Sequence, residues 1–290
     1  MSEPFGTRLA AAMAAHGPLV VGVDPHPGLL AAWGLPDTAA GLDSFAATCV
    51  AAFAGEVAAI KPQAAFFERH GAAGFAVLER HVAQARDAGL LVVLDAKRGD
   101  IGTTVAAYAD AYLAPGAPLA VDALTASPYL GVGSLDPLVD AARASGAGLF
   151  VLARTSNAEG AGVQDARTPD GATVAQGVLA AVGALNRADG PGGPGGGTGA
   201  LGSFGAVVGL GGGAAAPSAQ ALLDVGGPLL VPGLGAQGGS VADVAALAGP
   251  AARQVLAAAS RSVLAAGPDP AALGAAARAL AGELAAALGY

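Results

Sequence analysis

The 290 residues carry a formal net charge of −8 at pH 7, so the chain can bury a large core but offers no basic surface for a nucleic acid. One cysteine, Cys49, excludes an internal disulfide framework and a cysteine-ligated metal cluster. Glycine and proline interrupt the charge-free stretches too often for a spanning helix. The apolar residues 9–15 faintly resemble the core of a signal peptide, but the segment is short, follows the acidic Glu3 and leads directly into a strand-like run, so we interpret it as a first helix. We therefore expect a cytoplasmic protein with no membrane or nucleic-acid partner.

Strand-like apolar runs alternate with alanine-rich segments of helical periodicity. The runs are residues 19–23, 57–60, 90–94, 119–124, 149–152, 206–210, 229–231 and 255–258. The helix-like segments include residues 44–54, 73–88, 103–113, 172–186 and 241–248. Eight such β and α units predict a parallel (β/α)8 TIM barrel that forms a single domain over residues 1–290. A doubly wound open sheet is the alternative.

A glycine- and proline-rich segment at about residues 190–203 separates a predicted helix from the sixth strand. In a barrel, a loop that leads from a helix to a strand lies at the N-terminal face, away from the chemistry. We therefore interpret this segment as a flexible insertion without a role in the reaction.

The third apolar run leads directly into a cluster of charges. Side chains alternate along a strand, so Asp95 and Lys97 are expected on the same face, and Gly99 lets the chain turn so that Asp100 follows from the loop. The simple alternative is a strand that ends in solvent. Against it, four charged residues fall within six positions of a chain that is only 12% charged.

Polar residues also follow other predicted strands, at the end where barrel enzymes keep their sites. Asp24 follows the first strand and Lys61 the second, and these are an acceptor and a donor suited to ribose hydroxyls, or else members of a structural ion pair. After strands seven and eight, a glycine-rich loop containing Gln237 and the side chain of Arg261 fit a phosphate, unless Arg261 forms a surface ion pair. The four histidines show no metal-ligand spacing.

The setting of Lys97 decides between two kinds of lysine chemistry. A Schiff-base lysine needs an apolar pocket or a neighbouring cation that favours its neutral form. Flanking carboxylates favour the ammonium instead, so Lys97 is expected to donate a proton. A fixed ammonium in an anionic cluster suits the quenching of a carbanion, such as one left when a carboxylate departs as CO2.

The sequence LDAKRGDIGTT at residues 94–104, together with KPQAAFFE at residues 61–68, resembles the longer bacterial branch of the orotidine 5′-phosphate decarboxylases. The resemblance runs from about Val20 to Arg261. It implies conversion of orotidine 5′-phosphate to UMP and CO2 in pyrimidine biosynthesis, without a metal or organic cofactor. Lys97 would protonate C6 of the pyrimidine, and Asp95 would face the substrate carboxylate.

The same resemblance implies further roles and a partner. Asp100, Ile101 and Thr104 would reach into the site of a second subunit, which makes the active form a homodimer with shared sites. The remaining implied substrate contacts are Asp24 and Lys61 to the ribose, Ser156 to the pyrimidine edge, Gln237 and Arg261 to the phosphate, and Pro232 at the start of a closing loop.

Two other functions stay open. One is a magnesium-dependent sugar-phosphate lyase on the same barrel, although such relatives place a metal-binding carboxylate where this chain has Lys61. The other is a non-catalytic binder of nucleotide phosphates, although pure binding does not need Asp95, Lys97 and Asp100 together.

Overall fold

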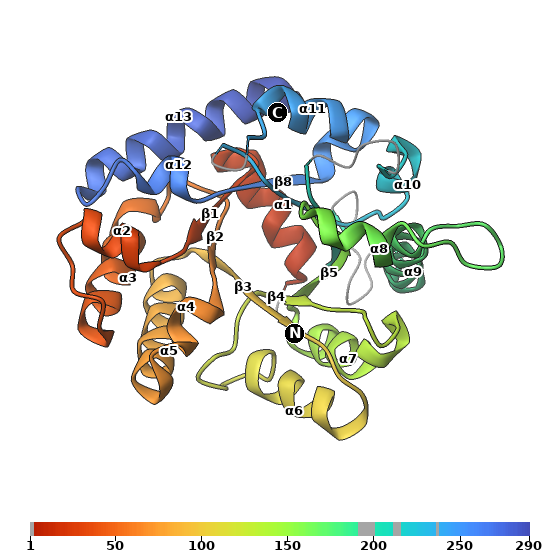
Figure 1. Cartoon of the computed structure of the whole chain (residues 1–290), viewed down its shortest axis with the longest axis horizontal. Coiled ribbons are helices and arrows are strands. Elements are labelled where there is room, and N and C mark those ends of the chain that lie inside the picture. The colour runs from red at the N-terminus through yellow and green to blue at the C-terminus, as the bar shows by residue number, and fades with distance from the viewer. Residues whose placement is uncertain (1–2, 191–200, 211–215, 236–237) are drawn as a thin grey trace.

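The computed structural model describes residues 3–190, 201–210, 216–235 and 238–290, and it shows a closed barrel of eight parallel strands (Figure 1). The strands pair in chain order, and β1 also pairs with β8. Their bounds are β1 Leu19–Val23, β2 Ala59–Pro62, β3 Leu91–Arg98, β4 Ala123–Ala126, β5 Gly148–Arg154, β6 Phe204–Val208, β7 Leu229–Pro232 and β8 Val255–Ala259. The predicted TIM barrel is confirmed, and the open sheet is excluded.

Helices surround the barrel, as Figure 1 shows. Their bounds are α1 Phe5–His16, α2 Pro27–Ala32, α3 Ala39–Phe53, α4 Ala64–Glu68, α5 Gly71–Asp87, α6 Gly102–Tyr112, α7 Asp136–Ser145, α8 Ala161–Gln164, α9 Val174–Asp189, α10 Ala219–Leu223, α11 Val241–Ala248, α12 Arg261–Leu264 and α13 Pro270–Leu288. Several begin at residues suited to capping: the side chains of Thr173 and Ser240 each form a capping box, and Asp269 precedes a proline at the first helical position.

The core has two layers because strand side chains alternate between the two faces of the sheet. Outward-facing residues such as Leu19, Val21 and Val23 of β1 pack under the helices. Inward-facing residues such as Val20 fill the barrel together with Phe5, Leu9 and Met13 of α1. The ring of Phe5 meets that of Phe150 edge-on, with centroids 5.9 Å apart. Helix α1 thus closes the N-terminal end of the barrel with apolar side chains.

Helix α13 is long and apolar enough to cross a membrane by length and composition alone. It packs against α3, β1 and α11 on the outside of the barrel. The α13 side chains that are buried in the core include those of Leu273, Ala277, Ala281 and Leu284. One face of α13 is therefore buried in the helical shell.

The C-terminal end of the glycine-rich segment belongs to the packed structure. The Gly202 N–H donates to the Gly226 carbonyl at 2.9 Å, and Ser203 Oγ accepts from the Gly6 N–H at 3.1 Å. Ser203 is 1% exposed. Residues 191–200, which hold most of the predicted insertion, lie outside the described residues.

Strand β4 begins four residues later than the apolar run 119–124 suggests, since residues 117–120 form a turn and pairing with β3 starts at Ala123. Asp122 therefore lies just before the strand. Its carboxylate accepts hydrogen bonds from the Arg8 side chain of α1 and, at 2.9 Å, from the Val92 N–H of β3. Arg8 also donates to the Gly146 carbonyl at 3.1 Å. Asp122 and Arg8 together thus fasten the closing helix to β3, to the start of β4 and to Gly146 at the bottom of the barrel.

Asp122→Ala is expected to lower the free energy of unfolding by about 2 kcal/mol, because it removes the acceptor of two donors that are largely shielded from water. Urea unfolding followed by circular dichroism measures the loss. Asp43→Ala is the matched control, since it breaks an exposed ion pair with Arg80 and should change the value by less than about 1 kcal/mol. Equal effects of the two substitutions would contradict the role given to Asp122.

Candidate active site

The inward-facing positions at the C-terminal ends of the first four strands carry polar side chains. Asp24 follows β1, Lys61 lies in β2, Asp95 and Lys97 lie in β3, and Thr125 lies in β4. All of these except Lys97 stand two residues beyond an inward-facing apolar or glycine position on the same strand, as the two-residue period of a strand requires. The barrel changes from an apolar interior to a polar mouth at this level.

Asp95 lies between two ammonium groups. Lys61 Nζ donates to Asp95 Oδ2 at 3.0 Å, and Lys97 Nζ donates to Asp95 Oδ1 at 2.6 Å. These are the only two lysines in the sequence, where all other basic side chains apart from the histidines are arginines. The shared face predicted for Asp95 and Lys97 is confirmed, and Lys61 is both a cavity residue and an ion-pair member.

The ion pairs outweigh the effect of burial on the pKa values of both Lys61 and Asp95. Burial disfavours a charged Asp95, but the charges of Lys61 and Lys97 and their hydrogen bonds outweigh it and lower the pKa of Asp95 to about 2. Burial likewise disfavours a charged Lys61, but the charges of Asp95 and Asp24 raise the pKa of Lys61 above its usual value. At neutral pH the mouth of the barrel therefore holds an ionised carboxylate beside a protonated lysine.

The third predicted member of the charge cluster lies elsewhere within the chain. Asp100 Oδ1 accepts the N–H of its neighbour Ile101 at 2.8 Å, and in the described part of the chain the carboxylate paired with Lys97 is that of Asp95. The expectation of one ammonium between two carboxylates is therefore wrong for a single chain. The reason is that Gly99 packs against the Ser127 carbonyl and the chain then turns outward into α6.

Arg98 also leaves the cluster, because the next position of the strand faces outward. Its guanidinium donates to Glu68 of α4 and, at 3.3 Å, to the Tyr112 hydroxyl of α6. It also lies 5.5 Å from the ring centroid of Tyr108. Arg98 thus joins β3 to the two helices that flank it.

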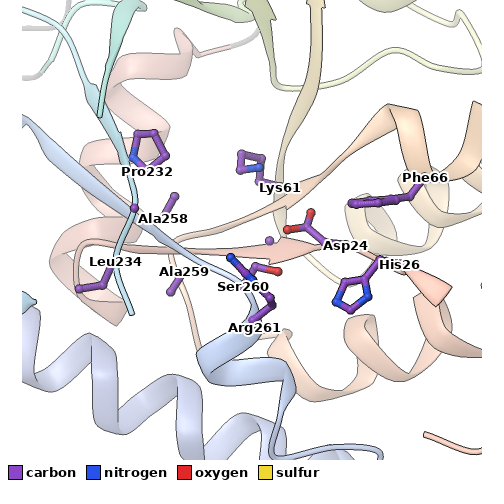
Figure 2. Close-up of a pocket in the computed structure, with 12 residues that line it drawn as sticks. Asp24, His26, Lys61, Phe66, Pro232, Leu234, Ala258, Ala259, Ser260 and Arg261 are labelled. Carbon is purple, nitrogen blue, oxygen red and sulfur yellow. The ribbon is translucent and has the colours of Figure 1, made fainter. Parts of the chain in front are cut away.

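A cavity of about 460 Å³ opens beside Lys61, within the size range of small-molecule sites (Figure 2). Asp24, His26 and Phe66 lie at one side, Pro232 and Leu234 at the other, and Ser260 and Arg261 between them. Four predicted site residues therefore share one cavity: Asp24, Lys61, Pro232 and Arg261. Asp24 Oδ1 is buried there without a hydrogen-bond partner among the described residues.

A second hollow of about 780 Å³ adjoins the first at Gly233 and contains Ser156, which places that predicted residue next to the cavity. Ile101 and Thr104 lie on the surface beyond β3, and the Ile101 side chain is 62% exposed. Gln237 lies outside the described residues. The structure thus brings the predicted residues of the strand ends together and leaves the start of α6 facing solvent.

Two side chains of the site were missed by reasoning from the sequence. Thr125 contacts Asp95, and Phe66 lines the cavity. Each is uncharged, so it does not stand out in an apolar sequence. Ser260, one of the polar residues that follow the eighth strand, also lines the cavity. Thr125 was detectable only by continuing the inward-facing period into the fourth strand. His26 caps α2 by accepting the Leu29 N–H at 3.2 Å, and it also lines the cavity.

Known proteins similar to the chain agree in name. A relative from Salinispora arenicola, named orotidine 5′-phosphate decarboxylase, is 57% identical over 95% of both chains. One from Streptomyces coelicolor with the same name is 54% identical over 93% of both. A solved structure from Streptomyces avermitilis is 54% identical, covers 100% of this chain and 97% of its own, and has a TM-score of 0.92.

A more distant solved structure, that of Leishmania donovani OMP decarboxylase, has a TM-score of 0.75 at 30% identity and covers 99% of this chain and 100% of its own. The family model for orotidine 5′-phosphate decarboxylase / HUMPS matches residues 17–277. The chain belongs to the orotidine 5′-phosphate decarboxylase / HUMPS family.

Proposed function

We propose that the chain decarboxylates orotidine 5′-phosphate to UMP and CO2 in pyrimidine biosynthesis, using its own side chains and no metal or organic cofactor. The observation that carries the proposal is the arrangement of Lys61, Asp95 and Lys97 at the mouth of the barrel. In it, an ionised carboxylate and a proton donor stand beside a cavity suited to a nucleotide.

The proposed reaction breaks one bond and forms one. The bond between C6 and the substrate carboxylate breaks, CO2 leaves, and the electron pair stays on C6. Lys97 Nζ then gives a proton to C6, which forms the C–H bond of UMP, and solvent returns a proton to the lysine. The Lys97 side chain is 45% exposed while that of Asp95 is 12% exposed, so the donor reaches the open mouth and the carboxylate stays behind it.

Asp95 has two effects in this scheme. It fixes the Lys97 ammonium by a hydrogen bond of 2.6 Å, which orients the proton before the carbanion forms. It also brings a negative charge next to the departing substrate carboxylate, which disfavours the bound substrate relative to the product. Stabilisation of the carbanion by the ammonium is the larger contribution, since that charge develops only as CO2 leaves.

The cavity supports the other proposed contacts. Asp24, Lys61 and Arg261 line it, which supports Asp24 and Lys61 as acceptor and donor for ribose hydroxyls and Arg261 as a phosphate ligand after strand eight. Gln237, the second proposed phosphate ligand, lies outside the described residues. Ser156 meets the pyrimidine edge from the adjoining hollow. Pro232, at the end of β7, begins the loop that closes over the phosphate.

We also propose that the active form is a homodimer in which Asp100, Ile101 and Thr104 enter the partner's site. Supporting this, Ile101 is 62% exposed although it is apolar, and Tyr129 and Leu130 beyond β4 are also largely exposed. Large exposed apolar side chains grouped beyond neighbouring strands are typical of a surface that a partner covers. A partner's Asp100 would supply the second carboxylate that Lys97 lacks within its own chain.

The chain is further proposed to act as one cytoplasmic domain over residues 1–290. The strands close a single barrel, and the outer core continues around it under the helices. Two alternatives are less well supported. A magnesium-dependent lyase would need an anionic ligand where the Lys61 ammonium lies, and a non-catalytic binder would not need both lysines on one carboxylate.

Purified protein is expected to consume orotidine 5′-phosphate in the presence of excess EDTA. The loss of ultraviolet absorbance by the substrate measures this turnover. Lys97→Ala should lower kcat by at least about 100-fold, because the proton donor is gone. Arg143→Ala is the control: it removes a cation that pairs with Asp189 outside the barrel and should leave kcat close to that of the wild type. Turnover by wild type only after magnesium is added would favour the lyase, and no turnover at all would favour the binder.

A mixture of Asp95→Ala and Asp100→Ala proteins is expected to recover activity. Each homodimer lacks a needed carboxylate in both sites, but a heterodimer joins Asp95 of one chain to Asp100 of the other in one of its two sites. Random exchange of subunits should give about one quarter of the wild-type rate. If the mixture stays inactive after exchange is shown by mass spectrometry, Asp100 acts within its own chain.

A further inference from the structure

The pairing of β3 with β4 is interrupted at the charged residues. Leu94 pairs with Leu124 and Arg98 pairs with Ala126, so three residues of β3 stand opposite a single residue of β4. That residue is Thr125, and the three opposite it are Asp95, Ala96 and Lys97. A strand with extra residues bulges, and the bulge leaves backbone groups without their ladder partners.

The Thr125 side chain occupies the place of the missing ladder. Lys97 donates its backbone N–H to Thr125 Oγ1 at 2.9 Å. Because an N–H only donates, the hydroxyl proton of Thr125 is free for another acceptor, and Thr125 Oγ1 lies 3.0 Å from Asp95 Oδ1. Asp95 Oδ1 also accepts a hydrogen bond from the Lys97 ammonium at 2.6 Å. A closed ring of hydrogen bonds therefore joins the two ends of Lys97 through Thr125 and Asp95.

The backbone of Lys97 needs this support. Its φ is 49°, in the left-handed region, and among the described residues it is the only one other than glycine with a positive φ. Residues other than glycine adopt this region when surrounding contacts hold them there. The contact that holds the Lys97 N–H is the Thr125 hydroxyl.

We infer that Thr125 is a positioning residue for the Lys97–Asp95 pair. This role rests on the proposed function. Thr125 holds the Lys97 backbone in the conformation that points the ammonium toward C6, and it orients Asp95 so that Oδ1 contacts the ammonium. Thr125 is 1% exposed, so it acts through its two neighbours and makes no contact with the substrate.

This role predicts which kinetic constant changes. Without the hydroxyl, the Lys97 N–H loses its acceptor and Asp95 Oδ1 loses one of its donors. Arg261 and Asp24 keep their places in the cavity. Binding of the nucleotide should therefore stay nearly the same, and transfer of the proton should slow down. A misplaced reacting group is expected to lower kcat by about 10- to 100-fold.

The kinetic test compares Thr125→Val, which keeps the shape of the side chain and removes the hydroxyl, with Thr125→Ser, which keeps the hydroxyl. Thr125→Val should lower kcat by at least about 10-fold and change KM and the Kd for UMP by less than about 3-fold. Thr125→Ser should stay within about 3-fold of the wild-type kcat. A kcat near wild type in Thr125→Val, or a Thr125→Ser protein as slow as Thr125→Val, would overturn the inference.

A matched control separates positioning from loss of stability. Ser203 is also 1% exposed and its hydroxyl also accepts a backbone N–H, but it lies before β6 at the closed end of the barrel. Ser203→Ala should lower the urea midpoint of unfolding and leave kcat unchanged. If Ser203→Ala lowers kcat as much as Thr125→Val does, the effect of Thr125 is on stability, and the inference is wrong.

A second measurement does not depend on turnover. Because the sequence has two lysines, protein labelled with [15N]lysine shows two backbone amide signals, those of Lys61 and Lys97. Hydrogen exchange of the Lys97 amide should be slow in wild type and Thr125→Ser, and at least about 100-fold faster in Thr125→Val, with Lys61 unchanged as the internal reference. Unprotected exchange of Lys97 in wild type alone would overturn the inference, even if Thr125→Val does not fold.

The two readouts also distinguish this inference from the proposed function. A wild-type protein that does not turn over orotidine 5′-phosphate but protects its Lys97 amide through Thr125 contradicts the function and supports the contact. A wild-type protein that turns over the substrate with an unprotected Lys97 amide contradicts the inference alone.

Discussion

Asp95 accepts hydrogen bonds from both lysines of the chain, and the arrangement of the barrel mouth depends on this carboxylate staying ionised. The two ammonium groups offset the unfavourable burial of its charge, and in return the carboxylate fixes where each ammonium points. Removing either member of a buried pair leaves an uncompensated charge at a cost of about 3–5 kcal/mol. The choice of lysine is chemical as well as structural, because an ammonium can give up a proton at neutral pH whereas a guanidinium does not.

The rest of the fold makes this buried charge cluster possible. Helix α1 closes the other end of the barrel with apolar side chains, and Asp122 fastens that helix to the strands. The alternation of strand side chains then delivers Asp24, Lys61, Asp95 and Thr125 to the same end of the barrel from four strands. The bulge in β3 lies at these same residues, and within it the Lys97 ammonium donates to the Asp95 carboxylate at 2.6 Å.

The barrel and the common face of Asp95 and Lys97 followed from periodicity, which depends only on local geometry. The contact between Asp95 and Lys61 of β2 could not be predicted from periodicity, because it depends on how β2 and β3 align in the sheet. The outward course of Asp100 depends on the close approach of Gly99 to Ser127, and the late start of β4 on a turn at residues 117–120. Thr125 was missed because a hydroxyl in an apolar strand carries no charge that marks it.

The ionisation of Asp95 is the most direct test of this account. Protein labelled with 13C at the aspartate carboxyl carbons is titrated from pH 7 downward by NMR, and the Asp95 signal is assigned by its loss in Asp95→Asn. The account predicts that Asp95 keeps the chemical shift of a carboxylate below pH 4, in line with its pKa of about 2. An Asp95 midpoint at pH 4 or above would contradict it, because the carboxylate would then lack the two ammonium partners on which the site depends.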